Sequence, residues 1–135
     1  MTCSAIVTDN DRQVLLIIKK ATGKLLAPGG HIEPGDRDLR AAALRELHEE
    51  VGVPATAVVP LPGYENVPLD IDVHTIDANP SKVEPAHHHI DFRWGFLLPA
   101  TYAVTLEREE VDGYKWLPFS STASLTVRSK LALLP

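Results

Sequence analysis

The feature that most constrains this chain is one strongly helix-forming segment enclosed by residues that break regular structure. Residues 38–51 contain three consecutive alanines together with leucine, arginine and glutamate, which are all good helix formers. Pro28-Gly29-Gly30 precedes this segment and predicts a loop. Asp36 is the expected N-cap, Gly52 is the expected C-cap, and Pro54 prevents the helix from continuing. The sequence therefore predicts one long helix early in the chain, between segments that are not helical.

Those other segments have the composition of β-strands. They are rich in Val, Ile and Leu, or they alternate polar with apolar residues, and turn-forming residues separate them. The expected strands cover residues 2–8, 13–19, 24–27, 58–61, 70–76, 88–98 and 111–117, and a second helix is expected over 121–134. This order predicts an α/β (α+β) fold with helices on both faces of a mixed sheet. The length of 135 residues predicts one domain, residues 1–135.

The predicted first helix carries three glutamates close together near its C-terminal end. Each helical residue rotates by about 100°, so Glu46, Glu49 and Glu50 share one face, with the leucines nearly opposite. These carboxylates repel one another, and the helix dipole disfavours anions at this end. Helix stability therefore does not explain them, whereas a hard cation such as Mg²⁺, which takes oxygen ligands, would reverse both effects.

Arg45 stands one turn before Glu49 and is expected to pair with it. Such a pair would orient the carboxylate, lower its pKa and keep it ionised for metal binding or for work as a base. An Arg-Glu-x-x-Glu-Glu sequence on its own is nevertheless most often part of a solvated helix surface. The residues around it decide between the two interpretations.

Those surrounding residues make the pattern specific. Gly30 to Val53 has the sequence GHIEPGDRDLRAAALRELHEEVGV. It closely resembles the Nudix box, in which Gly, five residues, Glu and seven residues precede Arg-Glu-aliphatic-x-Glu-Glu-x-Gly-aliphatic. Arg45 to Val53 matches the second half of this pattern completely. Asp36 occupies the place of the first family glutamate, and one extra residue, near Arg37, lies between Gly30 and Arg45.

The Nudix resemblance implies an α/β/α sandwich with a central mixed sheet. It implies hydrolysis of a nucleoside diphosphate linked to another moiety, with Mg²⁺ or Mn²⁺ as the cofactor. On this analogy the metal ligands are Glu46, Glu49, Glu50 and a backbone carbonyl at Gly29-Gly30, for which we take Gly30. A small nucleotide-like diphosphate is then the partner, and a homodimer is one assembly compatible with the family.

The catalytic assignments follow from the same resemblance. Glu46 and Glu49 are expected to act in catalysis, one of them as the base, with Arg45 beside them. Cations neutralise phosphate oxygens and acidify a bound water, and positioning does most of the remaining work in phosphoryl chemistry. The family commonly adds a downstream acid. Glu107, Glu109 and Glu110 are candidates, of which we take Glu109, and a plain solvated acidic loop is the alternative.

A histidine-rich strand is the second candidate for the site. Side chains alternate along a strand, so His87, His89, Asp91 and Arg93 are expected on one face, and Asp70, Asp72 and His74 form a similar row on the preceding strand. The two rows predict a pocket for phosphate or sugar, with Arg93 as the natural phosphate partner. A bare solvated face and a zinc site at His74, His87 and His89 are the alternatives, although the spacing matches no closed zinc pattern.

Composition limits the remaining functions. The formal net charge of −5 argues against a nucleic-acid polymer as partner. The single cysteine fits a reducing compartment, and neither a signal peptide nor a membrane-spanning run is visible, so the expected location is cytoplasmic. The main rival to a hydrolase is a catalytically silent Nudix fold that binds a nucleotide or a protein. The three clustered glutamates argue against it, because a binding module does not need them.

Overall fold

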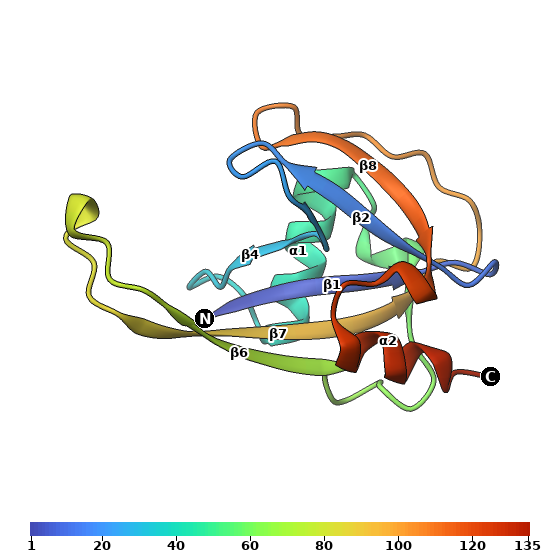
Figure 1. Cartoon of the computed structure of the whole chain (residues 1–135). Helices are drawn as coiled ribbons and strands as arrows, with labels where there is room; N and C mark the ends of the chain where they lie inside the picture. The colour runs from blue at the N-terminus through green and yellow to red at the C-terminus, as the bar shows by residue number, and fades with distance from the viewer.

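The computed structural model describes all 135 residues and confirms a sandwich in which a mixed sheet lies between two helices (Figure 1). The sheet has eight strands. The long strands are β1 (Thr2–Thr8), β2 (Gln13–Lys19), β6 (Asp70–Ile76), β7 (His87–Leu97) and β8 (Val111–Pro118), and the short ones are β3 (Leu25–Leu26), β4 (Gly29–His31) and β5 (Val59–Pro60). The helices are α1 (Leu39–Val51) and α2 (Leu125–Ala132), with short 3-10 turns at Ala55–Ala57, Pro80–Lys82 and Phe119–Ser121.

Strand β1 is the centre of the sheet. It runs parallel to β7 along its whole length, from Thr2 beside Asp91 to Thr8 beside Leu97. Its first three residues pair on the other side with β4, and its last residue pairs with β2. Strand β7 continues the sheet through β6 and β5, while β2 pairs with β8 and β3. This topology brings the start of β1, the glycines of β4 and the polar residues of β7 side by side.

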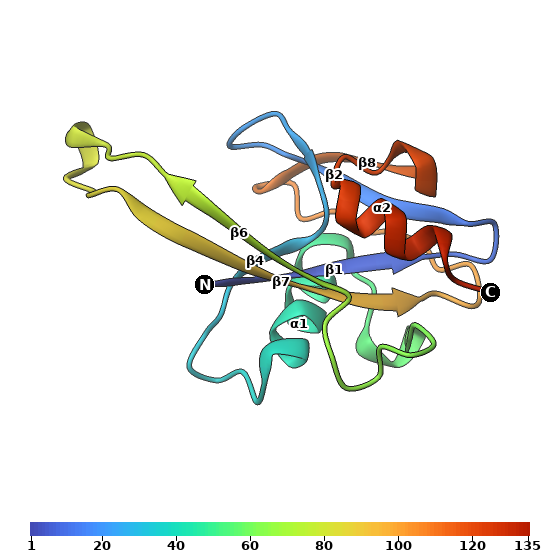
Figure 2. The ribbon, with the colours of Figure 1, turned by 60° about the horizontal axis from the view of Figure 1, so that its bottom comes forward.

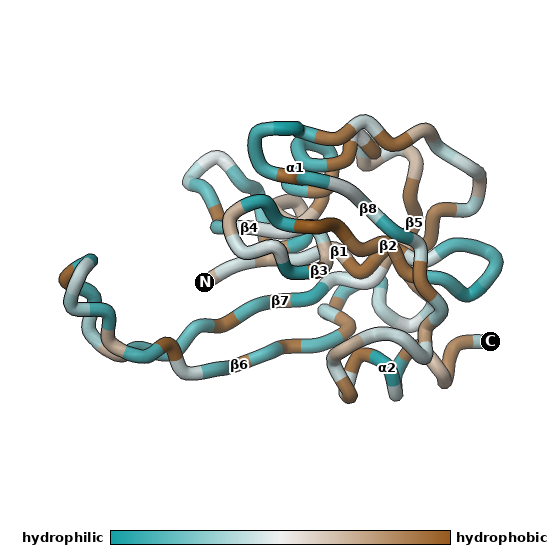
Figure 3. The backbone as a smooth tube through the Cα atoms, turned by 45° about the horizontal axis from the view of Figure 1, so that its top comes forward, coloured by the Kyte–Doolittle hydropathy of each residue, from teal (hydrophilic) through white to brown (hydrophobic).

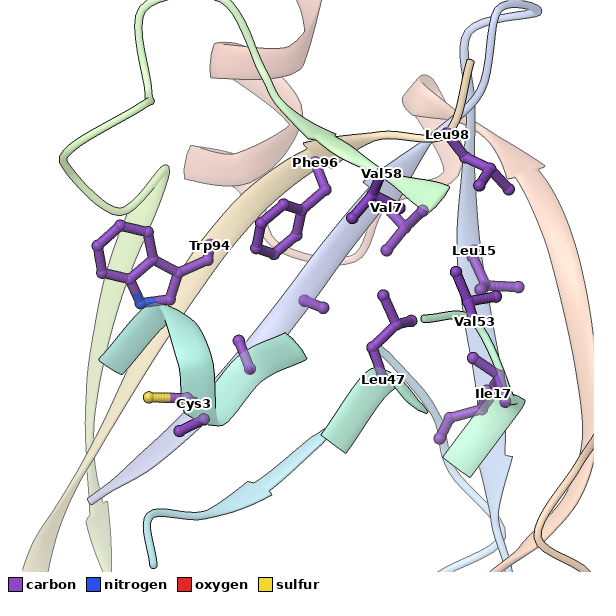
Figure 4. Packing of buried hydrophobic residues seen from close by; sticks show 14 of the residues in the cluster. Cys3, Val7, Leu15, Ile17, Leu47, Val53, Val58, Trp94, Phe96 and Leu98 are labelled. Carbon is purple, nitrogen blue, oxygen red and sulfur yellow. The ribbon is translucent and has the colours of Figure 1, made fainter. Parts of the chain in front are cut away.

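Two hydrophobic clusters cover the two faces of the sheet. The larger one joins the sheet to α1, and Figure 4 shows Leu47 of α1 among Leu15 and Ile17 of β2. The smaller one joins the opposite face to α2 and includes Ile6, Val14, Leu61, Leu69, Phe119, Val127 and Leu131. Strand β2 serves both clusters and is a nearly continuous hydrophobic run in Figure 3. Burial on both faces explains why its sequence does not alternate.

Helix α1 begins at a different residue from the one expected. Asp38, and not Asp36, is the N-cap, because the Asp38 carboxylate accepts a 2.7 Å hydrogen bond from the Ala41 N–H. The expected C-cap is present, and Gly52 has φ 74°, a left-handed conformation that glycine adopts without strain. The Asp36 carboxylate therefore does not cap α1 and can contact other side chains.

Two further expectations from the sequence were wrong. Gly29–His31 forms strand β4 and not a loop, because its backbone pairs with Cys3 and its neighbours in β1. Helix α2 begins only at Leu125, after a separate 3-10 turn at Phe119–Ser121, and the Ser124 hydroxyl caps it. For β4, tertiary strand pairing overrode the local turn pattern. For α2, a capping residue inside the expected helix set its start.

The outer halves of β6 and β7 leave the body of the molecule as a two-stranded arm (Figures 1 and 2). Its tip contains the 3-10 turn at Pro80–Lys82. Residues 81–88 are all exposed, so packing on the core does not hold this end of the arm. Neither helix of the chain is long and apolar enough to cross a membrane.

Replacement of Asp38 by alanine tests the corrected start of α1. We expect Asp38→Ala to cost about 1 kcal/mol of unfolding free energy, because an N–H of the first turn loses its partner. For a chain of this size the melting temperature should fall by about 3–5 °C, as measured by calorimetry. Asp38→Asn is the matched control, since asparagine also caps helices, and it should stay close to wild type. Equal losses in the two variants would contradict the capping role.

Candidate active site

Arg45 is the hub of the glutamate cluster. Its guanidinium makes a two-point contact with Asp36, from Nε to Oδ1 at 2.8 Å and from Nη2 to Oδ2 at 3.0 Å. Nη1 also donates to Glu46 at 3.1 Å and to Glu49 at 3.2 Å, so the expected pair of Arg45 with Glu49 is present. This contact with Arg45 holds the pKa of Asp36 below its usual range. Asp36 therefore fixes Arg45, which in turn holds two glutamates.

Glu50 is completely buried and ties three elements together. Its carboxylate accepts a 2.8 Å hydrogen bond from the Gly29 N–H of β4 and pairs with the ammonium group of Lys19 in β2. Lys19 also donates to the Gly29 carbonyl at 2.8 Å. Burial raises the pKa of Glu50, while Lys19 and the Gly29 N–H oppose that shift. The carboxylate thus sits in a closed ring of partners.

Glu46 lies against the glycine strand. A Cβ atom added at Gly30 would come within 2.6 Å of the Glu46 carboxylate, so a larger residue there would displace this carboxylate. Burial and the nearby charge of Glu50 raise the pKa of Glu46. Arg45 is its one cationic partner. Of the two buried glutamates, Glu46 is therefore the less well compensated.

The three glutamates that were predicted to share one face of α1 differ in their exposure. Glu46 and Glu50 are buried together with Leu47 and Val51, whereas the Glu49 side chain is 54% exposed. The sheet approaches α1 through β4, and this strand covers the edge of the glutamate face. Glu49 is the glutamate that reaches solvent.

The donor types fit a hard divalent cation. Glu46, Glu49 and Glu50 supply carboxylate oxygens, which Mg²⁺ prefers, and the Gly29-Gly30 backbone lies next to them. The oxygens do not form a finished ligand shell, because no three acidic, histidine or cysteine side chains converge on one point. Arg45 and Lys19 occupy the carboxylates instead. Binding of a cation would require Glu49 to turn away from Arg45, and its exposure allows that movement.

A pocket of about 450 Å³ adjoins the glycine strand. This volume suits a small molecule. Its lining comes from β1, the β2–β3 hairpin, β4, the inner parts of β6 and β7, and the segment before α2. Among the expected binding residues, His89, Asp91 and Arg93 line it, as do Asp72 and His74 from the preceding strand. Parts of both predicted polar rows therefore face one cavity, with Asp72 opposite Asp91 and His74 opposite His89, whereas Asp70 does not line it.

Arg93 is not the free phosphate partner that the sequence suggested. Its guanidinium lies 3.2 Å from Asp70, 3.6 Å from Asp72 and 3.4 Å from Asp91. Three carboxylates already satisfy this one cation. Asp91 is held in turn by the hydroxyls of Thr2 at 2.8 Å and Ser4 at 2.7 Å, both from β1.

His87 lies outside the pocket. It is exposed at the start of β7, and its Nδ1 contacts the Pro85 carbonyl at 2.9 Å. His74 and His89 do face each other, with ring centroids 5.0 Å apart. No group of three ligands forms with His87, so the zinc alternative finds no support in the geometry.

The loop acids are exposed, which matches the alternative of a solvated acidic loop that the sequence left open. Glu109 is exposed, and the contact it makes is from its own N–H to the Glu107 side chain. Glu110 is the loop acid whose charge helps to raise the pKa of Glu50. The backbone N–H of Glu107 donates to the Glu50 carbonyl, which fixes the loop to the end of α1.

Three residues at the site were missed by sequence reasoning. Thr2 and Ser4 alternate with buried residues at the start of β1, and this period-two pattern could have placed both on the Asp91 side. Lys19 ends the apolar run of β2 and looks from the sequence like an ordinary strand terminus. Its pairing with Glu50, 31 residues later, is a tertiary contact without a local sequence signal.

Comparison with known proteins agrees with this architecture. A family model described as the NUDIX domain matches residues 1–132. The probable DHNTP pyrophosphohydrolase of Lactococcus lactis subsp. cremoris is 32% identical over 112 residues, which are 83% of this chain and 57% of that protein. The chain thus spans little more than half the length of this relative.

Solved structures show the same fold. The E. coli dihydroneopterin triphosphate pyrophosphohydrolase superposes with a TM-score of 0.70 at 17% identity, covering 96% of this chain and 90% of that one. A C. elegans Ap4A hydrolase in a binary complex gives 0.69 at 18% identity, covering 98% and 93%. At these identities the likeness concerns the fold alone. The family model, which includes the Arg45–Val53 segment, carries the assignment: this chain belongs to the NUDIX domain family.

Proposed function

We propose that this chain acts as one Nudix domain that hydrolyses a phosphoanhydride bond in a nucleoside diphosphate linked to another moiety. The observation that carries the proposal is the cluster of Glu46, Glu49 and Glu50, held by Arg45 and Lys19 beside a glycine strand that borders a substrate-sized pocket. A binding module needs none of this, because buried carboxylates cost stability unless they serve a purpose.

The proposed cofactor is Mg²⁺ or Mn²⁺, held by Glu46, Glu49 and Glu50 with a carbonyl of Gly29-Gly30. When bound, it would neutralise phosphate oxygens and lower the pKa of a water molecule. Within the protein, Asp36 and Arg45 hold Glu46 and Glu49 in place, and Lys19 holds Glu50 against β4. Glu49 is the proposed base, because its exposed carboxylate can take a proton from a water molecule.

Replacement of the proposed base tests the reaction. We expect Glu49→Gln to lower kcat by about 100-fold or more, because glutamine cannot accept the proton. Conversion of dihydroneopterin triphosphate, nucleoside triphosphates, Ap4A and ADP-ribose to their cleavage products should be measured by chromatography with Mg²⁺ and Mn²⁺, because Ap4A and ADP-ribose are cleaved without release of free phosphate or pyrophosphate. Glu84→Gln, an exposed glutamate on the arm, is the matched control and should behave as wild type. Absence of turnover on every compound by a folded, metal-binding protein would favour the catalytically silent module.

The raised pKa of Glu46 predicts how stability depends on pH in the metal-free protein. The folded state binds this proton more tightly than the unfolded chain does, so the unfolding free energy falls as pH rises through the raised pKa. Glu46→Gln removes this loss. The melting temperature of Glu46→Gln minus that of the wild type should therefore increase as the pH rises from acidic to neutral. Both proteins are measured with a chelator present. A constant offset between the two proteins across this range would refute the assignment.

Removal of Lys19 tests the ring around Glu50. We expect Lys19→Met to cost about 3 kcal/mol of unfolding free energy, because a buried carboxylate loses its cation. The double variant Lys19→Met/Glu50→Gln should recover much of this loss, since no buried charge remains. Lys20→Met is the control, because that exposed lysine lies 3.8 Å from Asp112 and contributes little. Additive losses in the double variant would exclude direct coupling of Lys19 and Glu50.

A further inference from the structure

The pocket has two chemically different sides. The side formed by β2 to β4 carries Lys19 and Lys24 beside the glycines that border the glutamate cluster. The side formed by β6 and β7 carries Asp72, Asp91 and Arg93. If the proposed function holds, on which this inference rests, the diphosphate belongs near the first side. The second side then faces the remainder of the substrate.

Charge on the second side disfavours a phosphate there. Arg93 is shared by Asp70, Asp72 and Asp91, and the one further cation, Lys130, is bound to Asp70 at 3.1 Å. Three carboxylates thus face two cations. A phosphate would meet a net negative surface and would have to compete with these aspartates for Arg93.

Hydrogen bonding leaves mostly acceptors on this side. The Thr2 hydroxyl gives its one proton to Asp91, so the 3.2 Å contact with His89 Nε2 requires that nitrogen to be the donor. Burial and the neighbouring His74 lower the pKa of His89, which favours the neutral ring with Nδ1 as an acceptor. The hydroxyl protons of Thr2 and Ser4 are already used by Asp91, and Arg93 directs Nε to Asp91 and Nη1 to Asp70.

Two carboxylates on this side retain unused acceptor capacity. Asp72 and Asp91 lie directly opposite each other across β6 and β7, an arrangement that destabilises a sheet because like charges repel. One oxygen of Asp72 contacts His74 at 2.8 Å, and the other has no partner. Asp91 accepts three protons, from Thr2, Ser4 and Arg93. Both of its oxygens share the Ser4 proton, at 3.0 and 2.7 Å, so one of the roughly four lone pairs of this carboxylate is occupied only by a shared contact.

The pocket also has apolar side chains, which suit the face of a ring. They include Ile6 of β1, Leu16 of β2, Ala27 before β4 and Val127 of α2. Thr122 also lines the pocket; it is 7% exposed, and its hydroxyl has no hydrogen-bond partner within the protein. Buried hydroxyls are rarely left without partners. The Thr122 oxygen is itself buried, so a ligand could reach it only after a local movement of this segment.

We propose that the β6–β7 side of the pocket binds a heterocycle through adjacent ring N–H and exocyclic NH₂ donors, received by Asp91 and Asp72. This donor pair is the 2-amino-4-oxopyrimidine edge, which guanine and pterins share. Adenine and cytosine place a ring acceptor next to their amino group, and uracil and hypoxanthine have no amino group there. A carboxylate facing any of these bases would find at most one of the two donors.

Ligands without phosphate test this proposal separately from hydrolysis. The probes are guanosine, neopterin, inosine and adenosine, titrated calorimetrically into wild-type protein in a chelator. Guanosine or neopterin, or both, should bind about tenfold or more tightly than inosine, which lacks only the 2-amino group, and adenosine should bind no better than inosine. If guanosine binds more tightly than neopterin, the natural ligand is a guanine nucleotide. If neopterin binds more tightly, it is a pterin.

Variants locate the binding groups. Asp91→Asn and Asp72→Asn should each remove most of the guanosine-to-inosine preference, whereas Asp77→Asn, an exposed residue on the arm, should retain it. Thermal melting checks that each variant folds, and Asp72, which is partly exposed, provides a test if Asp91→Asn does not fold. Equal affinity for guanosine and inosine in the wild type, or a preference unchanged in the variants, would overturn the proposal. Hydrolysis without base preference would defeat this inference alone, and base preference without hydrolysis would defeat only the proposed function.

Discussion

The buried carboxylate of Glu50 is the contact around which the site is arranged. It joins α1 to the Gly29 N–H of β4 and to the Lys19 ammonium of β2, and the Glu50 carbonyl holds the loop that leads to β8. A buried charge is tolerated only when it is paired and hydrogen-bonded, so these partners have to stay in place. This requirement fixes the end of the helix against the sheet, and with it the neighbouring glutamates.

Arg45 compensates the negative charge of the other carboxylates in the cluster. Its planar guanidinium binds Asp36 at two points and still reaches Glu46 and Glu49, which a lysine could not do with the same geometry. Asp36 is shorter than the glutamate of the Nudix pattern, yet both of its oxygens contact Arg45. The two glutamates are thus held close together despite their repulsion, a cost that is expected where function and not stability selects the residues.

The pocket owes its polarity to two strand pairings that both involve β7. Parallel pairing of β1 with β7 places the hydroxyls of Thr2 and Ser4 beside Asp91, while antiparallel pairing of β6 with β7 places Asp72 across from it. Acidic and hydroxyl groups therefore gather on one side, and the lysines of the β2–β3 hairpin lie on the other. Such a division suits a ligand with an anionic end and a donor-rich end.

The sequence by itself determined most of the elements, the fold class and the family motif, because periodicity and the Arg45–Val53 spacing are local properties. It missed strand β4 and the exact starts of both helices, which depend on strand pairing and on the choice among several possible caps. It also predicted that Asp91 and Arg93 share a face, since alternation on a strand is local as well. Only the tertiary structure decided that Arg93 is neutralised, that Glu46 and Glu50 are buried while Glu49 is exposed, and that Lys19 pairs with Glu50. These outcomes depend on which strand lies beside which, and contacts between residues far apart in the chain leave no mark in the local pattern.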